Sequence, residues 1–454
     1  MALAFRPEDD NPLVRALLAD LRVAPGTLDL AIDERDEMLG FLTAAEEGDR
    51  ERGLFQYFRT GASIAESLGQ VLRWRFGDPG TIGKAFDFAS GYGRVTRFLV
   101  REIPPDRLRV ADVYADGVRF QEERFGVRGT VSAIRPADFV CAERFDAILV
   151  TSLFTHLPEA RFVEWLRVLL GLLEPGGMLV FSAHSPEVLP PGVVMPESGF
   201  LFHATSESGS LDASDYGSTW VTEEFVRDAL EREGVPSSRI PRALCGFQDL
   251  YVAGPGLDFS ALDFQAEPLL FVESARLSEG RLELEGWAAV RSGDDARSVE
   301  VLLDGELLAS APVDLDRADV AGLLGRPGLR PGWRCVCPIP EEASRSRAVL
   351  LLRAVDGRGR GHPLWAGSIE RLLLAAARLE IGSLKHEKAD AWAAYERERI
   401  DLARMAREVQ RLGGLVASME ASRFWKLRNA WFRVKGVFRK STDEHGQART
   451  DTEG

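Results

Sequence analysis

The residues most able to do chemistry together lie in one short stretch, Asp87-Phe-Ala-Ser90-Gly91-Tyr-Gly93. An apolar run breaks at these glycines and continues into an amphipathic pattern, which predicts a strand, a tight turn and a helix. Glycine lets the backbone come close to a ligand, and Asp87 can accept hydrogen bonds at the same place. A two-glycine turn alone is weak evidence, because many strand-to-helix turns contain glycine for conformational reasons.

Further along the chain, other strand ends carry polar residues that strengthen this pattern. Asp112 ends a second apolar run about 20 residues on, where a doubly wound sheet places the carboxylate that binds a ribose diol. A β-rich run then ends at Ser152, and a helical segment leads to Glu-Pro-Gly-Gly at 174–177 before the strand 178–182. This order predicts an α/β fold with a Rossmann-like doubly wound sheet.

With these motifs in this order, residues 60–255 resemble the class I S-adenosylmethionine-dependent methyltransferases. The first turn of that family has an acid followed by alternating glycines, and this chain departs from it in having Ala89 at the first glycine. The resemblance implies that the turn lines the methionine part of S-adenosylmethionine, that Asp112 holds the ribose hydroxyls and that Asp138 meets the adenine amine. The cofactor-binding residues expected on this basis are Asp87, Ala89, Ser90, Gly91, Gly93, Asp112, Asp138 and Ser152.

A dinucleotide-dependent dehydrogenase shares the strand, the turn and the acid, and is the nearest alternative. Its fingerprint needs a third glycine for the pyrophosphate-binding helix, but Arg94-Val-Thr96 stands at that spacing here. The Pro-Gly-Gly hinge is also typical of methyltransferases rather than dehydrogenases. Both features favour the methyltransferase interpretation.

Methyl transfer to a hydroxyl requires an aligned nucleophile and a base that takes its proton. The candidate bases near the expected carboxyl edge of the sheet are His156, His184 and His203, with Asp215 and Tyr216 behind them. Histidine suits the role because its pKa lies near neutrality. His156 follows the fourth strand and is the first choice, and a structural role for it, in packing or capping the next helix, is the competing interpretation.

Two segments are expected to surround this site. Residues 1–60 are acid-rich with helical periodicity, which predicts a helical cap that either packs on the sheet or forms a lid over the substrate. Residues 184–220 are rich in Pro, Gly and Ser and predict a long irregular loop that contacts the substrate. The methyltransferase domain is expected over residues 61–256, with 248–253 as its last strand.

Length, composition and charge exclude several other classes. The 454 residues predict two to four domains, and the formal net charge of −14 argues against general nucleic-acid binding. Four scattered cysteines predict neither a disulfide framework nor a metal site, and Cys335 and Cys337 are expected to be ordinary buried thiols. No secretory signal and no apolar run of about 18 residues is recognisable, so a cytoplasmic location is expected.

The sequence pattern changes near residue 267, which predicts a second domain. Five or more short alternating strands with two Asp-Gly turns predict an antiparallel β-sandwich over 267–366. It resembles, more loosely, the immunoglobulin-like modules of bacterial glycosyltransferases and surface-polysaccharide enzymes in its pieces Gly286-Trp-Ala and Arg317-Ala-Asp-Val. Three tryptophans of this domain either bind sugar or lie in its core: Trp287, Trp333 and Trp365.

The C-terminal part is expected to be helical. Residues 369–422 follow heptads, which predicts a coiled coil and homo-oligomerisation, with a helical hairpin as the alternative. Residues 423–440 carry seven Lys or Arg and an aromatic stripe, the pattern of an interfacial helix that binds anionic membranes. Docking on an acidic partner or on the chain's own acidic surface is the other interpretation. Residues 441–454 predict a disordered tail.

These patterns predict a cytoplasmic enzyme that transfers a methyl group from S-adenosylmethionine to a hydroxyl of a sugar or lipid-linked glycan in surface-polysaccharide biosynthesis. A glycan or nucleotide-sugar acceptor, a second copy through 369–422 and the inner face of the membrane through 423–440 are the expected partners, and nucleic acid is not. The alternative is a catalytically degenerate methyltransferase fold that organises polysaccharide enzymes as a scaffold. Ala89 and the lack of a decisive catalytic base favour this alternative.

Overall fold

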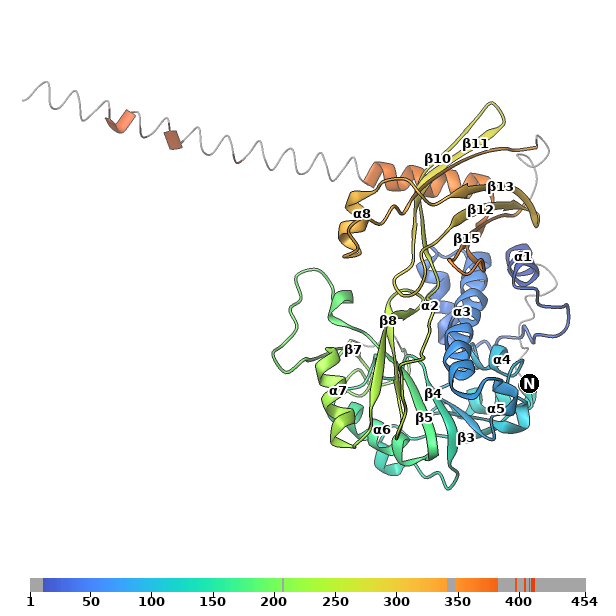
Figure 1. Ribbon diagram of the computed structural model, residues 1–454, viewed down its shortest axis with the longest axis vertical. Coiled ribbons are helices and arrows are strands. Elements are labelled where there is room, and N and C mark those ends of the chain that lie inside the picture. The colour runs from blue at the N-terminus through green and yellow to red at the C-terminus, as the bar shows by residue number, and fades with distance from the viewer. Residues whose placement is uncertain are drawn as a thin grey trace, which may run out of the picture. The chain divides into compact units, whose positions relative to one another are not determined.

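A computed structural model describes residues 11–205, 208–340 and 348–382, together with 397, 404–405, 408 and 410–412. The described residues up to Ala377 belong to one compact unit, and those from Arg378 onward belong to a second. The site lies in the first unit, whose helices and strands are labelled in Figure 1.

A seven-stranded mixed sheet forms the centre of the region up to Ala253, in the order β3-β2-β1-β4-β5-β9-β8. Its first five strands are parallel to one another: β1 (Ala85–Phe88), β2 (Leu108–Asp112), β3 (Arg128–Val131), β4 (Phe145–Val150) and β5 (Leu173–Ala183). The strand β9 (Gln248–Ala253) runs antiparallel to both β5 and β8 (Ser237–Leu244). The predicted α/β fold with a mostly parallel sheet is therefore confirmed, and β8 is a strand that the sequence analysis did not predict.

Both faces of this sheet are buried, which explains why its strands read as continuous apolar runs. Alternate residues enter two different cores: Ala147 and Leu149 pack on one side, whereas Ile148 and Val150 pack on the other. The helices of this region are α1 (Pro12–Asp20), α2 (Glu37–Ala45), α3 (Arg50–Phe76), α4 (Thr96–Leu99), α5 (Ala115–Phe125), α6 (Glu159–Gly171) and α7 (Glu223–Arg232). Of these, α1 and α2 pack against α3. In Figure 1, α3 and α5 lie on one side of the sheet and α6 and α7 on the other.

Some local predictions differ from the structure. The helix after the glycine turn, α4, has only four residues. The Pro-Gly-Gly hinge lies inside β5, where the pairing with β4 shifts register between Phe145 and Ala147. The expected loop 184–220 contains a two-stranded antiparallel sheet of β6 (Phe200–His203) and β7 (Ser218–Val221), because the apolar side chains of Phe200 and Val221 pack into the core beneath. The division expected at residue 60 falls within α3.

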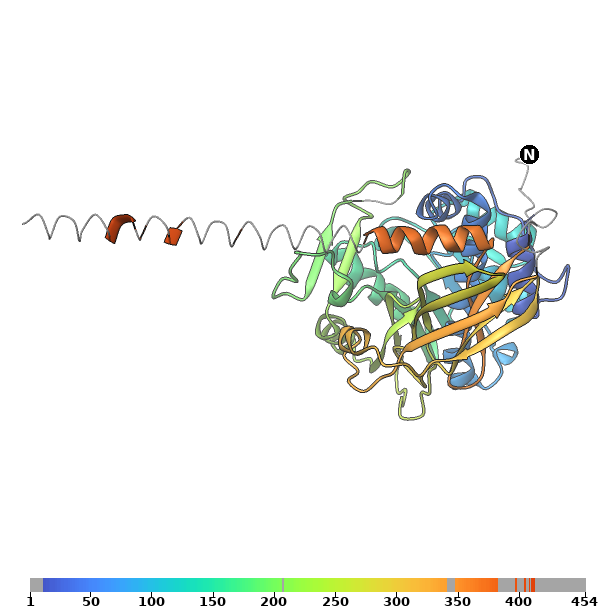
Figure 2. The ribbon, with the colours of Figure 1, turned by 90° about the horizontal axis from the view of Figure 1, so that it is seen from above.

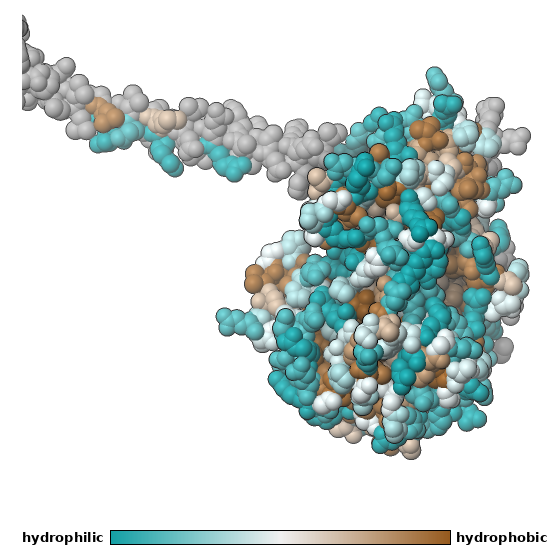
Figure 3. Space-filling model, in the orientation of Figure 1, coloured by the Kyte–Doolittle hydropathy of each residue, from teal (hydrophilic) through white to brown (hydrophobic). Residues whose placement is uncertain are grey.

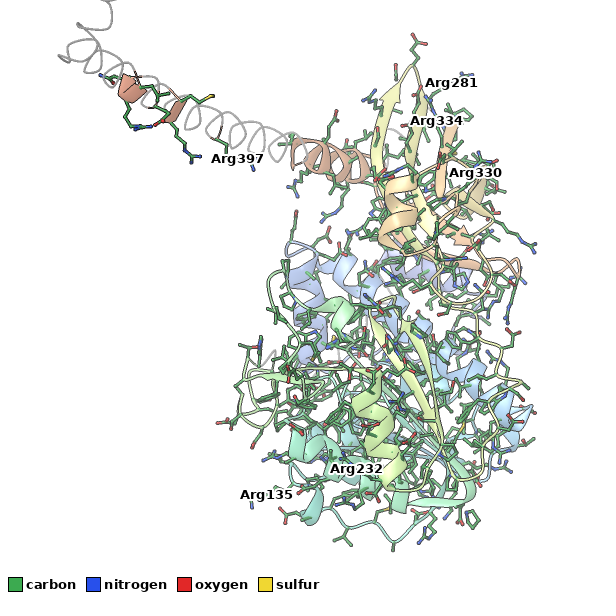
Figure 4. The ribbon with its side chains drawn as sticks, turned by 60° about the vertical axis from the view of Figure 1, so that its left-hand side comes forward. Arg135, Arg232, Arg281, Arg330, Arg334 and Arg397 are labelled. Atoms are coloured by element: carbon green, nitrogen blue, oxygen red, sulfur yellow. The ribbon has the colours of Figure 1, made fainter. Side chains whose placement is uncertain are left out.

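Two antiparallel sheets follow the seven-stranded sheet in the chain. One consists of β10 (Leu269–Ser278), β11 (Arg281–Ala289) and β14 (Gly332–Pro338), and the other of β13 (Glu306–Pro312), β12 (Ser298–Leu303), β15 (Leu350–Val355) and β16 (Gly361–Gly367). A short helix, α8 (Ala318–Leu323), precedes β14. Figure 2 shows these strands from above, and Figure 4 labels Arg334 on β14, which pairs with Glu285 at 3.0 Å.

The tryptophans of these sheets favour the core interpretation over sugar binding. Trp333 is 1% exposed and Trp287 is 8% exposed. The Arg52 guanidinium lies over the ring of Trp365, 5.1 Å from its centroid. These contacts occupy the surfaces that a sugar ring would need for stacking.

Polar contacts hold the two antiparallel sheets against the long helix α3. Glu267 accepts hydrogen bonds from Arg59 at 3.1 Å and from Ser63 at 2.9 Å. Arg52 donates to the carbonyl oxygen of Ala366 at 2.6 Å. Binding experiments on this protein therefore need the full chain, because removing the sheets would leave these α3 side chains without their partners.

Residues 369–382 are helical. Most of the predicted coiled coil, and all of the basic segment 423–440 and the tail 441–454, lie outside the described residues. Within the part of the chain that the structure describes, no helix has the length and apolar character needed to cross a bilayer. On the face shown in Figure 3, hydrophobic residues are interspersed among hydrophilic ones.

Candidate functional site

A cavity of about 950 Å³ opens at the carboxyl ends of the parallel strands. Its wall contains the residues that end or follow four of them: 87–92 at β1, 112–114 at β2, 132–134 beyond β3 and 151–153 beyond β4. Doubly wound sheets bind ligands at this edge, because several loops converge there with backbone groups that are not used by the sheet.

The two glycines of the first turn have different structural tasks. Gly91 has φ 58°, and no atom lies within 4 Å of the position that a Cβ would take, so its backbone faces open space in the cavity. Gly93 has φ 78°, and a Cβ there would lie 2.4 Å from the ring of Phe125 on α5. Gly91 therefore allows close approach of a ligand, whereas Gly93 allows close packing of α5 and does not line the cavity.

Ala89, which replaces the first glycine of the family pattern, itself has a left-handed backbone with φ 60°. This conformation costs an alanine about 1–2 kcal/mol relative to glycine. Ser152, after β4, shares it with φ 62°, and its N–H donates to Ser182 Oγ at 2.8 Å. Strained backbone at two neighbouring strand ends, both on the cavity wall, is typical of a functional site.

Asp112 joins the ends of β1 and β2. Its Oδ2 accepts a hydrogen bond from Gly91 N at 2.7 Å, and its Oδ1 accepts one from Tyr114 N at 3.0 Å. Burial raises the pKa of this carboxyl. A carboxylate has about four acceptor positions, so these bonds leave capacity for a hydroxyl of a ligand diol.

Asp87 is 1% exposed, at the end of β1. Its Oδ2 lies 2.7 Å from Thr96 Oγ1, a residue of α4 that the sequence analysis did not single out. Burial raises the pKa of Asp87 to about 7, and the like charge of Asp112 contributes in the same direction, while the Thr96 bond opposes it. A buried carboxyl in a cleft with a pKa perturbed in this way is a candidate for a functional site.

Of the remaining residues expected to bind the cofactor, some line the cavity and one lies on the protein surface. Ser90 and Ser152 line the cavity, but Asp138 does not. The 3₁₀ helix η4 (Pro136–Asp138) places Asp138 on the exposed surface, after Arg135, which Figure 4 labels at the edge of the molecule. Residues 132–134, which follow β3, line this part of the cavity instead of Asp138, and they include Ser132 and Ile134.

Of the three candidate histidines, His156 lines the cavity. Its ring stacks on Tyr216, with centroids 4.3 Å apart and planes at 17°. Its Nδ1 lies 2.7 Å from the carbonyl oxygen of Gly217, which can only accept, so Nδ1 carries a proton and donates. In the neutral ring Nε2 is then the basic atom.

His184 and His203 lie outside the cavity wall. Burial lowers the pKa of His184 to about 4, and its Nδ1 is 3.3 Å from Thr219 O. His203 ends β6 and meets the ring of Trp220 edge-on, with centroids 5.4 Å apart. His184 reaches Trp220 through an isolated bridge just after β5, and the β6–β7 pairing brings His203 to the same ring.

The N-terminal region contributes residues 32–41 and Thr43 to the wall, the position that a lid over the substrate would take. Arg97 of α4, only 1% exposed, holds it in place by donating to the carbonyl oxygens of Asp29 and Ala31, both at 3.0 Å. Tyr57 donates to Asp36 Oδ2 at 2.6 Å, and burial raises the pKa of Asp36.

A second segment, 208–216, also contributes to the wall, and it meets the N-terminal region where Ser210 Oγ donates to Glu37 Oε1 at 3.3 Å. Tyr114, which follows β2, forms hydrogen bonds through its hydroxyl with Ser210 at 2.8 Å and Ser208 at 3.1 Å. Arg161 pairs with Asp215 at 2.6 Å. These bonds fix hydroxyl and carboxylate groups beside the strand ends, and only Asp215 and Tyr216 of this segment were candidates from the sequence.

Comparisons with known proteins give distant similarities. No family model matches the chain, and no curated protein matches its sequence. Similar solved structures include DhpI in complex with SAH (18% identity, 48% of this chain and 96% of that chain, TM-score 0.32). A second is the glycopeptide N-methyltransferase MtfA with S-adenosyl-L-methionine (18% identity, 43% of this chain and 93% of that chain, TM-score 0.32). A third is Streptomyces venezuelae DesVI (17% identity, 50% of this chain and 99% of that chain, TM-score 0.35).

Proposed function

We propose that this protein is an S-adenosylmethionine-dependent methyltransferase. The observation that carries the proposal is the open position above Gly91, with the two buried carboxylates Asp87 and Asp112 beside it at the carboxyl ends of β1 and β2. A ligand with a ribose diol and a cationic amino-acid tail matches these groups. The strand order, with a single antiparallel strand β9 between β5 and β8, agrees with the resemblance found in the sequence.

The residues of the wall fit the parts of this cofactor. Asp112 offers acceptors to the ribose hydroxyls, and Asp87 offers a carboxyl to the α-ammonium group. The strip 132–134 provides the side wall for the adenine. When bound, S-adenosylmethionine supplies an electrophilic methyl group on its sulfonium sulfur, so the protein has to align the acceptor and accept a proton.

The acceptor that we propose is a hydroxyl of a sugar or lipid-linked glycan. A cavity of about 950 Å³ is at the upper end of the range for one ligand of about 300–1,000 Å³, which leaves room for an acceptor beside the cofactor. Ser208, Ser210 and Asp215 line the wall with groups that bind hydroxyls. His156 Nε2 takes the proton, because the Gly217 carbonyl keeps the other ring nitrogen protonated.

The expected assembly and location are part of this proposal. A coiled coil over 369–422 would join copies of the chain, and the basic segment 423–440 would bring the site to the inner membrane face, where a lipid-linked acceptor would be found. The scaffold alternative depended on Ala89 and on the lack of a decisive catalytic base. Ala89 adopts the left-handed backbone itself, so the path of the turn is kept, and His156 on the cavity wall is the base that we propose. No observation on the described residues favours the scaffold.

His156→Asn tests the catalytic part of this proposal. Asparagine keeps a donor near the position of Nδ1 but has no counterpart of Nε2, so methyl transfer is expected to fall about 10²–10⁴-fold while affinity for S-adenosylhomocysteine stays within about twofold. The measurement is transfer of labelled methyl from S-adenosylmethionine to nucleotide sugars and extracted lipid-linked glycans by the full chain.

His203→Asn is the matched control, because His203 lies outside the cavity wall. It should transfer at the wild-type rate. Wild-type transfer by His156→Asn would remove His156 as the base, and binding of the cofactor without transfer to any acceptor would return the scaffold as the better account.

A further inference from the structure

The hydroxyl of Thr96 faces two hydrogen-bond acceptors at once. Its Oγ1 lies 2.7 Å from Asp87 Oδ2 and 2.7 Å from Gln121 Oε1, and all three side chains are buried. A hydroxyl has one hydrogen to donate. In one of the two contacts, therefore, the hydrogen must come from the partner of Thr96, which is either Asp87 or Gln121.

The orientation of the Gln121 amide decides which contact that is. Its Nε2 donates to the carbonyl oxygen of Gly91 and to Ser90 Oγ, both at 2.9 Å. A flipped amide would turn Oε1 toward the Gly91 carbonyl, so that two acceptors would meet. Oε1 must therefore face Thr96, and it can only accept the hydrogen of the Thr96 hydroxyl.

Asp87 then has to supply the hydrogen of its own contact with Thr96. A protonated Asp87 donates to Thr96 Oγ1, Thr96 donates to Gln121, and Gln121 donates to the glycine turn, so each member of the chain is satisfied. An ionised Asp87 would take the Thr96 hydrogen and leave Gln121 Oε1 without a donor. Burial of Asp87 and the like charge of Asp112 on β2, the charged group that acts on it, favour the same protonated form.

The other oxygen of Asp87 is the one that a ligand can use. No described residue donates a hydrogen bond to Asp87 Oδ1, and Asp87 is part of the cavity wall. A cation bound there stabilises the ionised carboxylate by direct attraction in a buried setting. Binding of a cation and loss of the proton are therefore coupled.

We propose that Asp87 is protonated in the unliganded protein and that a ligand ammonium group replaces this proton on binding, with Thr96 and Gln121 as positioning residues that set the exchange. The inference rests on the proposed function, since the ammonium is that of S-adenosylmethionine or its product. The proton leaves Asp87 for the solvent, and the Thr96 hydroxyl turns from Gln121 to Asp87. The net charge at Asp87 and its partner stays at zero throughout.

The test is calorimetric titration of the full chain with S-adenosylhomocysteine at pH 7, in phosphate and in Tris, whose ionisation enthalpies differ. With a pKa of about 7 for Asp87, about half a proton is expected to be released per site. The affinity should rise close to tenfold from pH 5.5 to 6.5 and level off above pH 7.5. As a ligand control, 5′-methylthioadenosine lacks the amino group and should release none.

Three variants test whether the proton released on binding comes from Asp87. Asp87→Asn, titrated at higher concentrations, should bind with no proton release and no dependence on pH. Thr96→Val removes the hydroxyl that links Asp87 to Gln121, so both the number of protons released at pH 7 and the midpoint of the pH profile should move away from the wild-type values. Thr96→Ser keeps the hydroxyl and should restore the wild-type values.

The possible failures are distinguishable. Binding of S-adenosylhomocysteine without proton release and with a flat pH profile would overturn the exchange but keep the cofactor site. Release that persists in Asp87→Asn would assign the proton to another carboxyl and also overturn the inference. Absence of any binding by the folded chain would overturn the proposed function, and this inference with it.

Discussion

Gly91→Ala is expected to weaken the binding of S-adenosylhomocysteine by about 10–100-fold, whereas its neighbour Gly93→Ala is expected to act on stability. The added methyl group at 91 enters open cavity space next to the ligand and meets no protein atom within 4 Å. Its backbone strain costs only about 1–2 kcal/mol, so the variant should fold. Calorimetric titration and thermal unfolding of both variants measure the two effects separately.

Gly93→Ala is the matched control in the same turn. Its methyl group would lie 2.4 Å from the Phe125 ring and 2.9 Å from Gln121 Cγ, so unfolding free energy should fall by about 2–4 kcal/mol through overpacking and left-handed strain. Equal loss of affinity and stability in both variants would contradict the division of tasks between the two glycines. Ala89→Gly should bind as the wild type does, because it relaxes φ 60° without adding atoms.

Asp87→Asn is expected to lower affinity for S-adenosylhomocysteine about 100-fold while making the unliganded protein more stable above neutral pH. The affinity falls because a charge-assisted bond of about 1.5–3 kcal/mol to the ammonium is lost. Stability rises because the amide can donate to Thr96 as a protonated carboxyl does, and it has no proton to lose.

The sign of the pH effect follows from the raised pKa. Asp87 binds its proton more tightly when folded, with a pKa of about 7 against an ordinary value of about 3.9, so wild-type stability falls as pH rises between these values. The difference corresponds to about 4 kcal/mol at pH 8, which the variant should regain in denaturant unfolding. A variant less stable than wild type at pH 8 would contradict a buried, destabilising carboxylate.

The strand ends of the sheet were predictable because their chemistry is local. An apolar run that ends in an acid or a glycine turn fixes which residues follow each strand, and the register of parallel strands then brings Gly91 and Asp112 together. The sheet type followed from the same runs. The role of each glycine was not predictable, because it depends on the atoms around the position that a Cβ would take. The ring of Phe125 on α5 lies against that position at Gly93, whereas no atom lies within 4 Å of it at Gly91.

Other parts of the site depend on contacts that leave no pattern in a sequence. Arg97 holds the N-terminal segment through the carbonyl oxygens of Asp29 and Ala31, which any residue types would provide. The turn of η4 carries Asp138 to the surface although it lies only a few positions from the wall. In the sequence, Thr96 and Gln121 look like ordinary helix residues. Only the fold shows that they lie between Asp87 and the glycine turn.

The measurement that tests the central claim most directly is calorimetric titration of the full chain with S-adenosylhomocysteine, with NAD as the comparison ligand. The cavity geometry predicts micromolar binding of S-adenosylhomocysteine at one site per chain and no binding of NAD, because Arg94-Val-Thr96 follows the turn where a dinucleotide site needs its third glycine. Binding of NAD, or of neither ligand by the folded chain, would contradict the assignment of this cavity to S-adenosylmethionine.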